Sequence, residues 1–544
     1  MNAETLLLFV LAAVAVVVVV RWFAGRTGLP AAALLPVVGI TYALLPGPNV
    51  VLEPEIVLTF VLPPLLYSAA LDSSLLAIRR NVRIVVSLSV ILVLITALVI
   101  GYGFHHLVAG ATLAAGIAVG AAAAPPDPVA ALAVGRKVGL PQRLVTIIQG
   151  EGLLNDATAL TILSFASAAV VGGGFSATAA VWKFVVAAVG GAATGAAVAY
   201  VVRLLRPLTR DPMSANAVSL ATPFAAYLLG EHLHVSGVLA VVVAGLVVGH
   251  HAPRAGSGAS RLQTSAVWRL VDFLLEGFVF LLIGQQLPEV IRGLREYETS
   301  TIVVAVAVSV GAVLLIRPLW LLLTQSLPRS LHSRLGTGQH SDKLTGREVT
   351  ALSWAGTRGV ISLAAVFTLP RITPDRDLLL FCTLVVVLVT LVGQGLTFAP
   401  LVRRLGLRAD AVDEARLRNE ARSASVRAAL ERLDDLQDPG DAAHRDPEEV
   451  AAEAEAIQVM RGLLGQRLAR YQGRLDLLQN AESPEMPVSP RYEAALRIRR
   501  AAMDAQREEL LRWRDAGTLP DEGLRVLERE LDHEERLLPD RPSA

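Results

Sequence analysis

The sequence is poor in cysteine and in charge. Cys382 is the single cysteine among 544 residues, so a disulfide within the chain is excluded. Only 18% of the residues are charged, against roughly 25% in an average soluble domain, while 53% are hydrophobic. The charges gather in short loops and in the C-terminal quarter, which leaves long apolar runs between them. This pattern predicts an all-α polytopic membrane protein that ends in a polar tail.

The sequence also lacks the motifs of several other classes of membrane protein. It has no His-Glu-x-x-His zinc motif and no Ser/His/Asp arrangement of an intramembrane enzyme, so we expect neither enzyme activity nor a cofactor. It has no carbonyl-ring or charge-ring motif of a selectivity filter. A channel, or a membrane sensor with an output domain at residues 405–544, stays open as the alternative class of function.

Thirteen apolar ranges are candidates for membrane spans, each of which needs about 20 residues of helix. The first range does not resemble a cleaved signal peptide, because no basic residue precedes it and Arg21 and Arg26 follow it. The expected spans are 5–22, 29–46, 54–72, 83–106, 111–135, 143–172, 178–203, 215–231, 235–250, 265–287, 301–324, 348–369 and 377–402.

Basic residues recur in alternate loops between these ranges, for example at Arg79 and Arg80 and again at Arg403 and Arg404. Basic loops mark the cytoplasmic side of a membrane protein. Thirteen spans with the N-terminus outside satisfy this rule at every loop. We therefore expect residues 1–404 to form a transmembrane domain in the lipid of the inner (cytoplasmic) membrane. Residues 405–544 are expected to form a cytoplasmic helical tail, either structural or regulatory.

Two of the expected spans are interrupted by residues that weaken a helix. The fifth span contains the run Ala124, Pro125, Pro126, Asp127 and Pro128. Its three prolines remove amide donors and leave carbonyls of the preceding turn without partners. Irregular backbone at membrane depth is tolerated only where it is buried in protein or lines a wet cavity. We therefore expect a broken helix with Asp127 in the break.

The twelfth span contains a second interruption, in which Gly356 and Gly359 flank Thr357 and Arg358. The two interruptions lie seven spans apart, and two inverted repeats made of spans 1–6 and 8–13 would put them at equivalent positions. Such paired interruptions are the best sequence indication of a transporter binding site at the midplane. Asp127 and Arg358 also carry the charges that stabilise the N-terminal and C-terminal ends of helix stubs. We expect a second broken helix here.

The sixth span carries two acids and an amide, at Glu151, Asn155 and Asp156. A charge at the centre of the bilayer costs at least about 2.5 kcal/mol, so such residues usually have a function. Glu151 and Asn155 share one helix face, and Asp156 lies about 100° further round. Arg358 is the expected partner of Glu151 in a structural ion pair. Asp156 would then hold either a proton or a cation, and competition between the two would give exchange.

With these residues the chain resembles the monovalent cation/proton antiporters of the sodium/proton exchanger superfamily, in their bacterial NhaP-like branch. The resemblance covers residues 1–404 and rests on the order and spacing of several short motifs. These are Leu62-Pro-Pro-Leu-Leu66, Asp127-Pro-Val129, Glu151 to Asp156, His234-Val-Ser-Gly237, Glu276 to Gly284, and Arg358-Gly359.

The resemblance implies thirteen helices, a mobile core domain with the crossed broken helices, and a dimerisation domain. It implies that Asp156 carries the ion, that Asn155 braces the unwound backbone, and that the protein is a homodimer. A single Asn-Asp pair resembles members that exchange one cation for one proton without net charge. The implied ligands are Na⁺ at Asp156, with Li⁺ or K⁺ as alternatives, and H⁺. The resemblance also implies a role in pH homeostasis, and it implies no nucleic acid partner.

Three positions depart from the family pattern. Ser68 stands where relatives often have an acid, Pro126 where Thr or Val is usual, and Gly152 where Ser is common. Fewer side chains are then available to a cation, and backbone carbonyls near residues 123–125 would have to supply more of its oxygen ligands. These changes leave the choice between sodium and potassium open.

Two further charged residues lie in expected spans. Glu276 is a secondary site candidate because it lies in a matched motif, although a paired structural carboxylate is the simpler interpretation. Arg317 is expected to extend to the inner membrane surface.

Overall fold

A computed structural model describes residues 3–27, 29, 31–44, 54–170, 177–205, 208, 211–252, 258–326, 344–408, 411–436, 447–479, 490–516 and 519–535. Over these residues the secondary structure is helical throughout, without a strand. The chain divides into two compact units, Met1–Arg408 and Ala409–Ala544. The division falls close to the boundary expected after residue 404. The first unit is called the membrane unit below, and the second the tail unit.

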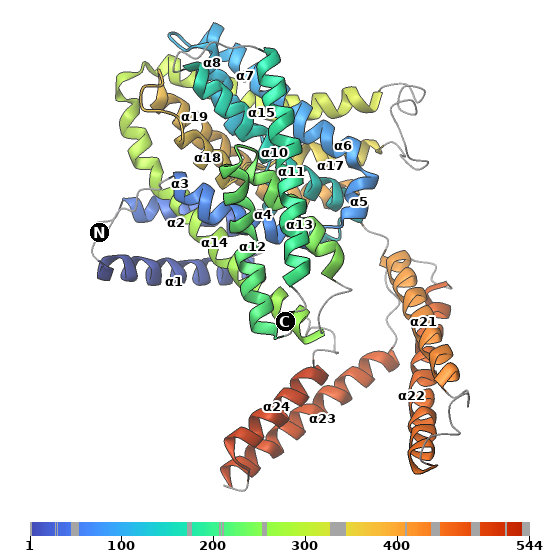
Figure 1. The fold of residues 1–544 in the computed structure, drawn as a ribbon. Helices are drawn as coiled ribbons and strands as arrows, with labels where there is room; N and C mark the ends of the chain where they lie inside the picture. The colour runs from blue at the N-terminus through green and yellow to red at the C-terminus, as the bar shows by residue number, and fades with distance from the viewer. Residues whose placement is uncertain are drawn as a thin grey trace. The chain divides into compact units, whose positions relative to one another are not determined.

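Helices occupy all of the ranges expected to span the membrane (Figure 1). Before the first break they are α1 (Ala3–Thr27), α2 (Ala31–Ala43), α3 (Pro54–Ile56), α4 (Leu62–Leu71), α5 (Leu75–Arg80), α6 (Val82–Val86), α7 (Leu92–Leu107) and α8 (Leu113–Ala123). After it follow α9 (Pro128–Val138), α10 (Gln142–Val170), α11 (Ala177–Leu205), α12 (Pro212–His232), α13 (Gly237–His251), α14 (Gly258–Gly293), α15 (Thr299–Ser326), α17 (Gly346–Trp354), α18 (Val360–Phe367), α19 (Arg376–Leu388) and α20 (Gly395–Leu405).

Three wide π-helical turns join some of these helices end to end, at Val57–Val61, Ser87–Ile91 and Val389–Gln394. The first turn directly precedes Leu62, Pro63 and Pro64. Because a proline has no amide hydrogen, the two prolines cannot donate to the carbonyls of the turn before them. Such turns occur frequently at functional sites in helices, and the third one contacts the site described below.

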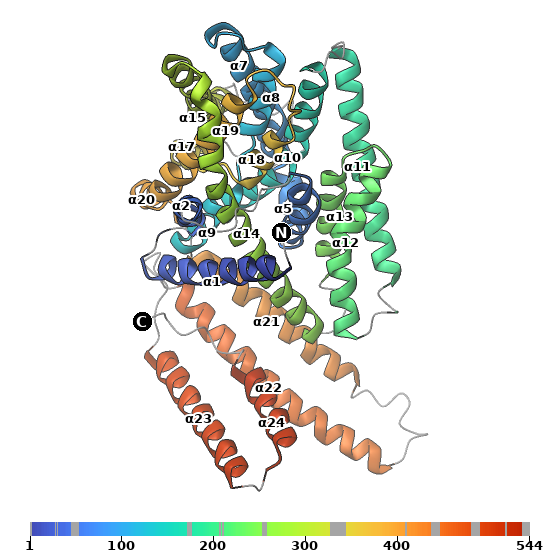
Figure 2. The ribbon, with the colours of Figure 1, turned by 90° about the vertical axis from the view of Figure 1, so that its left-hand side faces the viewer.

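The membrane unit contains three groups of packed helices. Helices α11, α12 and α13 lie side by side in both views (Figures 1 and 2). Helices α7, α8, α15 and α19 form a second group, and α1, α2 and α14 a third. Among the described residues, seven helices are long and apolar enough to cross a membrane, and three shorter ones are apolar. The exact number of spans and the inverted repeats stay predictions.

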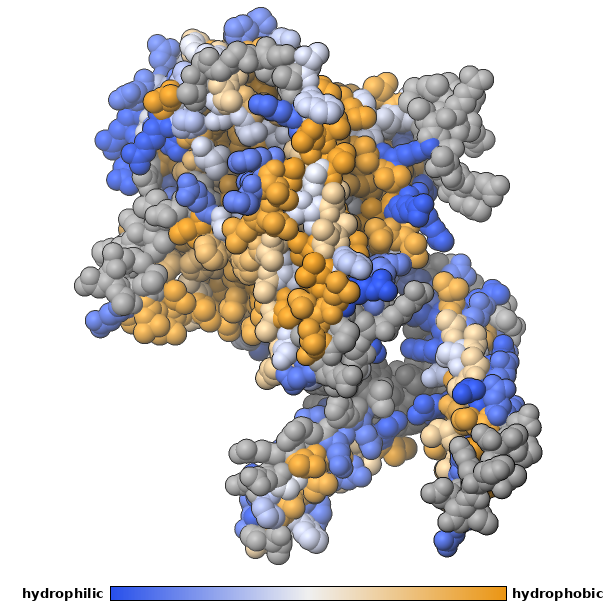
Figure 3. Space-filling model, in the orientation of Figure 1, coloured by the Kyte–Doolittle hydropathy of each residue, from blue (hydrophilic) through white to orange (hydrophobic). Residues whose placement is uncertain are grey.

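The outer surface of the membrane unit is apolar, as lipid contact requires. Figure 3 shows hydrophobic residues gathered over the face where α11 and α12 lie. On α11, Val181, Trp182 and Val189 are each more than 60% exposed. Large side chains with this exposure are unfavourable in water and favourable against acyl chains.

Glycines allow a close helix crossing in the membrane unit, between α2 and α14. A Cβ on Gly39 would collide with the carbonyl oxygen of Leu281, and a Cβ on Gly284 would collide with that of Pro36. Without side chains at Gly39 and Gly284 the two backbones come into direct contact. In lipid, where the hydrophobic effect does not drive helices together, such close packing is a main source of association.

The tail unit consists of charged helices that pack in pairs, α21 (Ala411–Leu436) with α22 (Pro447–Gln479) and α23 (Pro490–Asp515) with α24 (Asp521–Glu535). In the second pair, Arg507 contacts Asp532 at 2.6 Å and Glu535 at 2.7 Å. Exposed ion pairs of this kind add little stability. The cytoplasmic location of the tail unit and its role stay predictions.

Candidate functional site

The first broken helix is made of α8 and α9. Helix α8 ends at Ala123, and Asp127 is the N-cap of α9, with a carboxylate oxygen that accepts a hydrogen bond from the Val129 amide at 2.9 Å. Pro128 occupies the first position of α9, where a missing amide hydrogen has no consequence. The proline run therefore both ends α8 and begins α9, and the Asp127 carboxylate is fixed at the positive end of a helix.

The second broken helix is made of α17 and α18, joined by Ala355–Gly359. Gly356 lies between the side chains of Arg317 and Arg358. A Cβ added there would be 2.9 Å from Arg317 Cδ and 2.9 Å from Arg358 Nη1. The glycine leaves room for two arginines in a small buried space.

The two breaks are hydrogen-bonded to each other. The Asp127 amide donates to the Thr357 carbonyl at 2.6 Å, and Thr357 Oγ1 donates to the Asp127 carbonyl at 2.9 Å. A Cβ on Gly359 would overlap the Asp127 carboxylate. The irregular backbone of each break thus meets some of its hydrogen-bonding needs through the other.

Arg358 binds the C-terminal end of α8. Its Nε donates to the Ala123 carbonyl and its Nη2 to the Ala124 carbonyl, each at 3.0 Å, and Nη1 donates to the Gly356 carbonyl. Its own amide donates to Thr390 Oγ1 at 2.9 Å, in the third π-helical turn. A cation among C-terminal carbonyls satisfies orphan acceptors and the helix dipole together.

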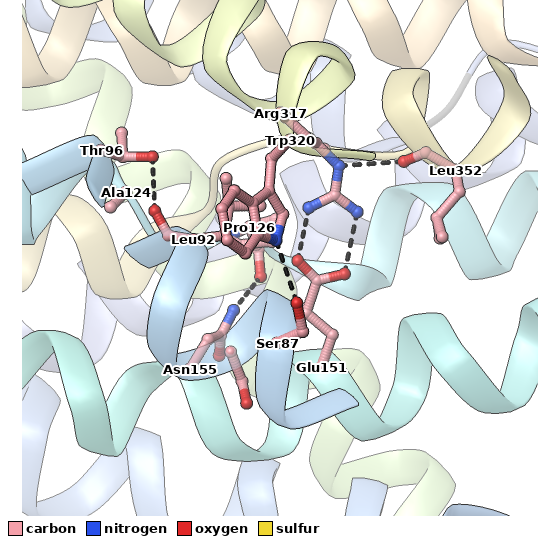
Figure 4. A network of polar contacts seen from close by, with 12 residues as sticks. Ser87, Leu92, Thr96, Ala124, Pro126, Glu151, Asn155, Arg317, Trp320 and Leu352 are labelled. Atoms are coloured by element: carbon pink, nitrogen blue, oxygen red, sulfur yellow. Dashed lines mark hydrogen bonds and ion pairs between the residues drawn. The ribbon is translucent and has the colours of Figure 1, made fainter. Parts of the chain in front are cut away.

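Glu151 forms its ion pair with Arg317, and the expected pairing with Arg358 is wrong (Figure 4). Arg317 Nη2 donates to Glu151 Oε2 at 2.8 Å, Nη1 contacts Oε1, and Nε donates to the Leu352 carbonyl at 2.9 Å. The reason is that each of the three guanidinium nitrogens of Arg358 donates to a backbone carbonyl at the breaks. These are the carbonyls of Ala123, Ala124 and Gly356. Arg317 is 2% exposed, so its expected extension to the membrane surface is also wrong.

Asn155 and Asp156 lie next to the first break. Asn155 Nδ2 donates to the Pro126 carbonyl at 2.7 Å, while its buried Oδ1 has no hydrogen-bond partner among the described residues. Asp156 is 5% exposed, and within the described part of the chain its carboxylate takes part in no hydrogen bond or ion pair. The site therefore leaves a carboxylate and an amide oxygen available at adjacent positions, both of them acceptors suited to a hard cation or a proton.

Gly152 has a packing role that its sequence position did not reveal. A Cβ there would lie 2.5 Å from Pro128 Cγ and 2.6 Å from Cδ. Any side chain at this position, a serine included, would push α10 away from α9. The absence of a side chain at Gly152 and the position of Pro128 are thus linked.

Ser68 and Glu276 belong to a second polar cluster, where α4, α14 and α1 meet. Ser68 Oγ donates to Asp272 Oδ2 at 2.6 Å, and Glu276 pairs with Arg21 at 3.0 Å. Glu276 is thus a paired carboxylate, as the simpler interpretation held. Sequence reasoning did not single out Asp272 or Arg21 for a site.

Sequence reasoning also missed Thr357 and Thr390, and it misplaced Arg317. Arg317 did give a signal, because it is a lone charge in the middle of an apolar range, and such a residue usually faces the protein interior. The threonines gave none. No group of three or more His, Cys, Asp or Glu side chains within the described ranges could hold a metal ion.

Broken helices that meet at a buried acid, inside an apolar helical unit, are typical of secondary transporters. The profile of the family described as "Sodium/hydrogen exchanger, transmembrane" matches residues 12–404. The chain therefore belongs to the sodium/hydrogen exchanger family. It is a multi-pass membrane protein and a cation/proton antiporter.

Its relatives include proteins of similar length. An uncharacterised Na(+)/H(+) exchanger of Mycobacterium tuberculosis is 32% identical, over 98% of this chain and 96% of its own. The Na(+)/H(+) antiporter ApNhaP of Aphanothece halophytica is 31% identical over 74% of each chain. The structure of the sodium proton antiporter MjNhaP1 from Methanocaldococcus jannaschii has a TM-score of 0.59, with 18% identity, over 74% of this chain and 99% of that one. At this identity the likeness concerns the fold.

Proposed function

We propose that the protein exchanges Na⁺ for H⁺ across the inner membrane, with Asp156 as the group that binds either ion. Asn155 Oδ1 supplies a second oxygen for the cation. Glu151, Arg317 and Arg358 hold the surrounding backbone and take no part in ion binding.

One observation carries this proposal: Asp156 is the acid of α10 that has no hydrogen-bond or ion-pair partner among the residues that the structure describes. Glu151, five residues earlier on the same helix, is fully engaged by Arg317. A buried carboxylate without a counter-charge is unfavourable unless a proton or a cation neutralises it. Because the two ions neutralise the same group, binding of one excludes the other. Alternating access of that group to the two sides of the membrane then gives obligatory exchange.

We expect an electroneutral exchange of one cation for one proton, because a single acid binds either ion. Asp127, the other acid of the two breaks, is engaged as the N-cap of α9. If Asp156 alone changes its charge state, each cycle moves one Na⁺ in one direction and one H⁺ in the other.

K⁺ is the second candidate for the transported cation. A relative in Bacillus subtilis, 30% identical over 65% of this chain, is named a sodium, potassium, lithium and rubidium/H(+) antiporter. Two of the carbonyls near residues 123–125, which were expected to bind the cation, accept hydrogen bonds from Arg358. A site with few rigid ligands favours broad selectivity among monovalent cations.

The test is proton flux in proteoliposomes on addition of Na⁺, Li⁺ or K⁺, with Asp156→Asn as the matched variant. Asn has the shape of Asp but cannot carry the charge. We expect Na⁺ to drive proton movement in the wild-type protein and not in the variant, which should remain folded. Exchange at the wild-type rate in Asp156→Asn would contradict the proposal, and flux with K⁺ alone would reassign the cation.

We further propose that the N-terminus lies outside the cell and the tail unit inside, that the protein is a homodimer, and that its exchange serves pH homeostasis. The basic residues of alternate loops support the orientation, and the family resemblance supports the dimer. Accessibility of the two termini to impermeant reagents in intact cells tests the orientation. Cross-linking in native membranes tests the dimer.

A further inference from the structure

We propose that Asp272, positioned by Ser68, is a second carboxylate of the transport path, which raises the affinity for the cation that Asp156 binds. This inference rests on the antiport function proposed above. It assigns to Asp272 a role in electrostatic attraction, distinct from the ion-carrying role of Asp156.

The first argument is the incomplete bonding of the Asp272 carboxylate. Oδ2 accepts the hydrogen bond from Ser68 at 2.6 Å, while Oδ1 is buried and has no hydrogen-bond partner in the described part of the chain. A carboxylate can accept about four hydrogen bonds. A purely structural acceptor for Ser68 would not need a second, buried and unpaired oxygen, whose desolvation is unfavourable.

The second argument is the contrast with Glu276, one helical turn further along the same face of α14. Glu276 forms an ion pair with Arg21 at 3.0 Å, and Arg21 also lies over the Phe273 ring. No cation is within ion-pair distance of Asp272 among the described side chains. The charged groups that face Asp272 are Arg21 of α1, Asp72 at the end of α4, and Glu276. Three carboxylates against one guanidinium leave a negative potential at this place, which attracts cations.

The third argument is the position of the Ser68–Asp272 contact relative to α10. The residues beside Ser68 on α4, Leu66 and Tyr67, share a hydrophobic cluster with Leu153 of α10, three residues before Asp156. Tyr67 also contacts Trp268, one turn before Asp272, with ring centroids 5.3 Å apart. Helix α4 therefore packs against α14 on one side and against the segment of α10 that carries the ion-binding residues on another. Asp272 is only partly buried, whereas Asp156 is 5% exposed.

Charge and hydrogen bonding at this contact can be separated by three variants. Asp272→Asn keeps an oxygen that accepts from Ser68 and removes the charge. Ser68→Ala keeps the charge and removes the hydrogen bond. The exchange Ser68→Asp with Asp272→Ser moves the carboxylate from α14 to α4 at the same contact.

The measurement is the Na⁺ concentration that gives half-maximal proton flux in proteoliposomes. We expect Asp272→Asn to raise this concentration roughly fivefold, because the variant removes one negative charge that attracts the cation. Ser68→Ala should raise the half-saturating Na⁺ concentration less. In the exchanged pair this concentration should lie within about twofold of the wild-type value. Asp211→Asn is the control: it removes a carboxylate from the membrane unit at the N-cap of α12, where Asn caps equally well.

Wild-type half-saturation in Asp272→Asn would overturn the inference, as would an exchanged pair no better than Asp272→Asn. If Asp272→Asn fails to fold, Asp272→Ser takes its place: this single change should raise the half-saturating Na⁺ concentration and the exchanged pair should lower it again, and a wild-type value in Asp272→Ser would overturn the inference. The failure of the antiport proposal looks different. In that case the wild-type protein shows no cation-dependent proton flux, or Asp156→Asn retains this flux, independently of the results for the Asp272 variants.

Discussion

Arg317 binds Glu151 through both terminal nitrogens of its guanidinium, and its Nε binds the Leu352 carbonyl in the last turn of α17. One side chain from α15 thus joins α10 to the first half of the second broken helix. Both partners of the ion pair are 2% exposed or less. The planar fork of Arg suits this bidentate arrangement, which the point charge of Lys could not reproduce.

Loss of one partner of this pair should destabilise the fold strongly. Arg317→Met removes the only guanidinium that is hydrogen-bonded to Glu151 among the described residues, and we expect a loss of about 3–5 kcal/mol in unfolding free energy. Exchange of the two residues, Glu151→Arg with Arg317→Glu, should recover part of it. Thermal unfolding of the purified proteins in detergent measures both effects. The matched cycle with Glu151→Gln gives the coupling energy, and additive losses from the two single changes would contradict the pair.

Gly359 should tolerate no side chain. A Cβ there overlaps the Asp127 carboxylate, so Gly359→Ala must separate the two breaks or displace the N-cap of α9. We expect a large loss of flux together with a loss of about 1–3 kcal/mol in stability, the usual result of overpacking.

The control for Gly359 is Gly346→Ala at the start of α17. Nothing lies within 4 Å of the Cβ added there. Ala is a better helix former than Gly, so this change should be neutral or slightly stabilising. Equal behaviour of the two variants in flux and in thermal unfolding would show that the contact between Gly359 and Asp127 does not matter.

The crossing of α2 and α14 gives a prediction about stability apart from ion binding. Gly284→Val should force the helices apart, because a Cβ on Gly284 already collides with the backbone of α2. We expect a lower unfolding temperature, with the half-saturating Na⁺ concentration of the folded fraction unchanged. Gly311→Val on α15 is the matched control, since open space surrounds Gly311. An unchanged unfolding temperature in Gly284→Val would mean that the crossing is looser than described.

Much of the fold was predictable because the bilayer simplifies the sequence pattern. Apolar ranges gave the helices of the membrane unit, and clusters of Pro and Gly gave both breaks, since a proline removes a donor wherever it stands. The two carboxylates and the amide of α10 were also visible, because polar residues in a membrane helix are conspicuous. The family followed from the order of these motifs.

Which charges meet could not be predicted in the same way. From the sequence, Arg358 was the expected partner of Glu151, and Arg317 was expected to extend to the membrane surface. The choice depends on how α15 and α17 approach α10, and on the carbonyls that occupy Arg358. From the sequence, Ser68 was only a position where an acid was expected and is absent. The tertiary structure showed that α14 places Asp272 against it.

The sequence by itself thus determined where the helices run, where two of them break, and which acid is the candidate for ion binding. The tertiary structure decided which charges neutralise one another and which glycines are needed for close approach. The physical reason is that periodicity and proline act through the local backbone, whereas an ion pair depends on the relative position of helices far apart in the chain.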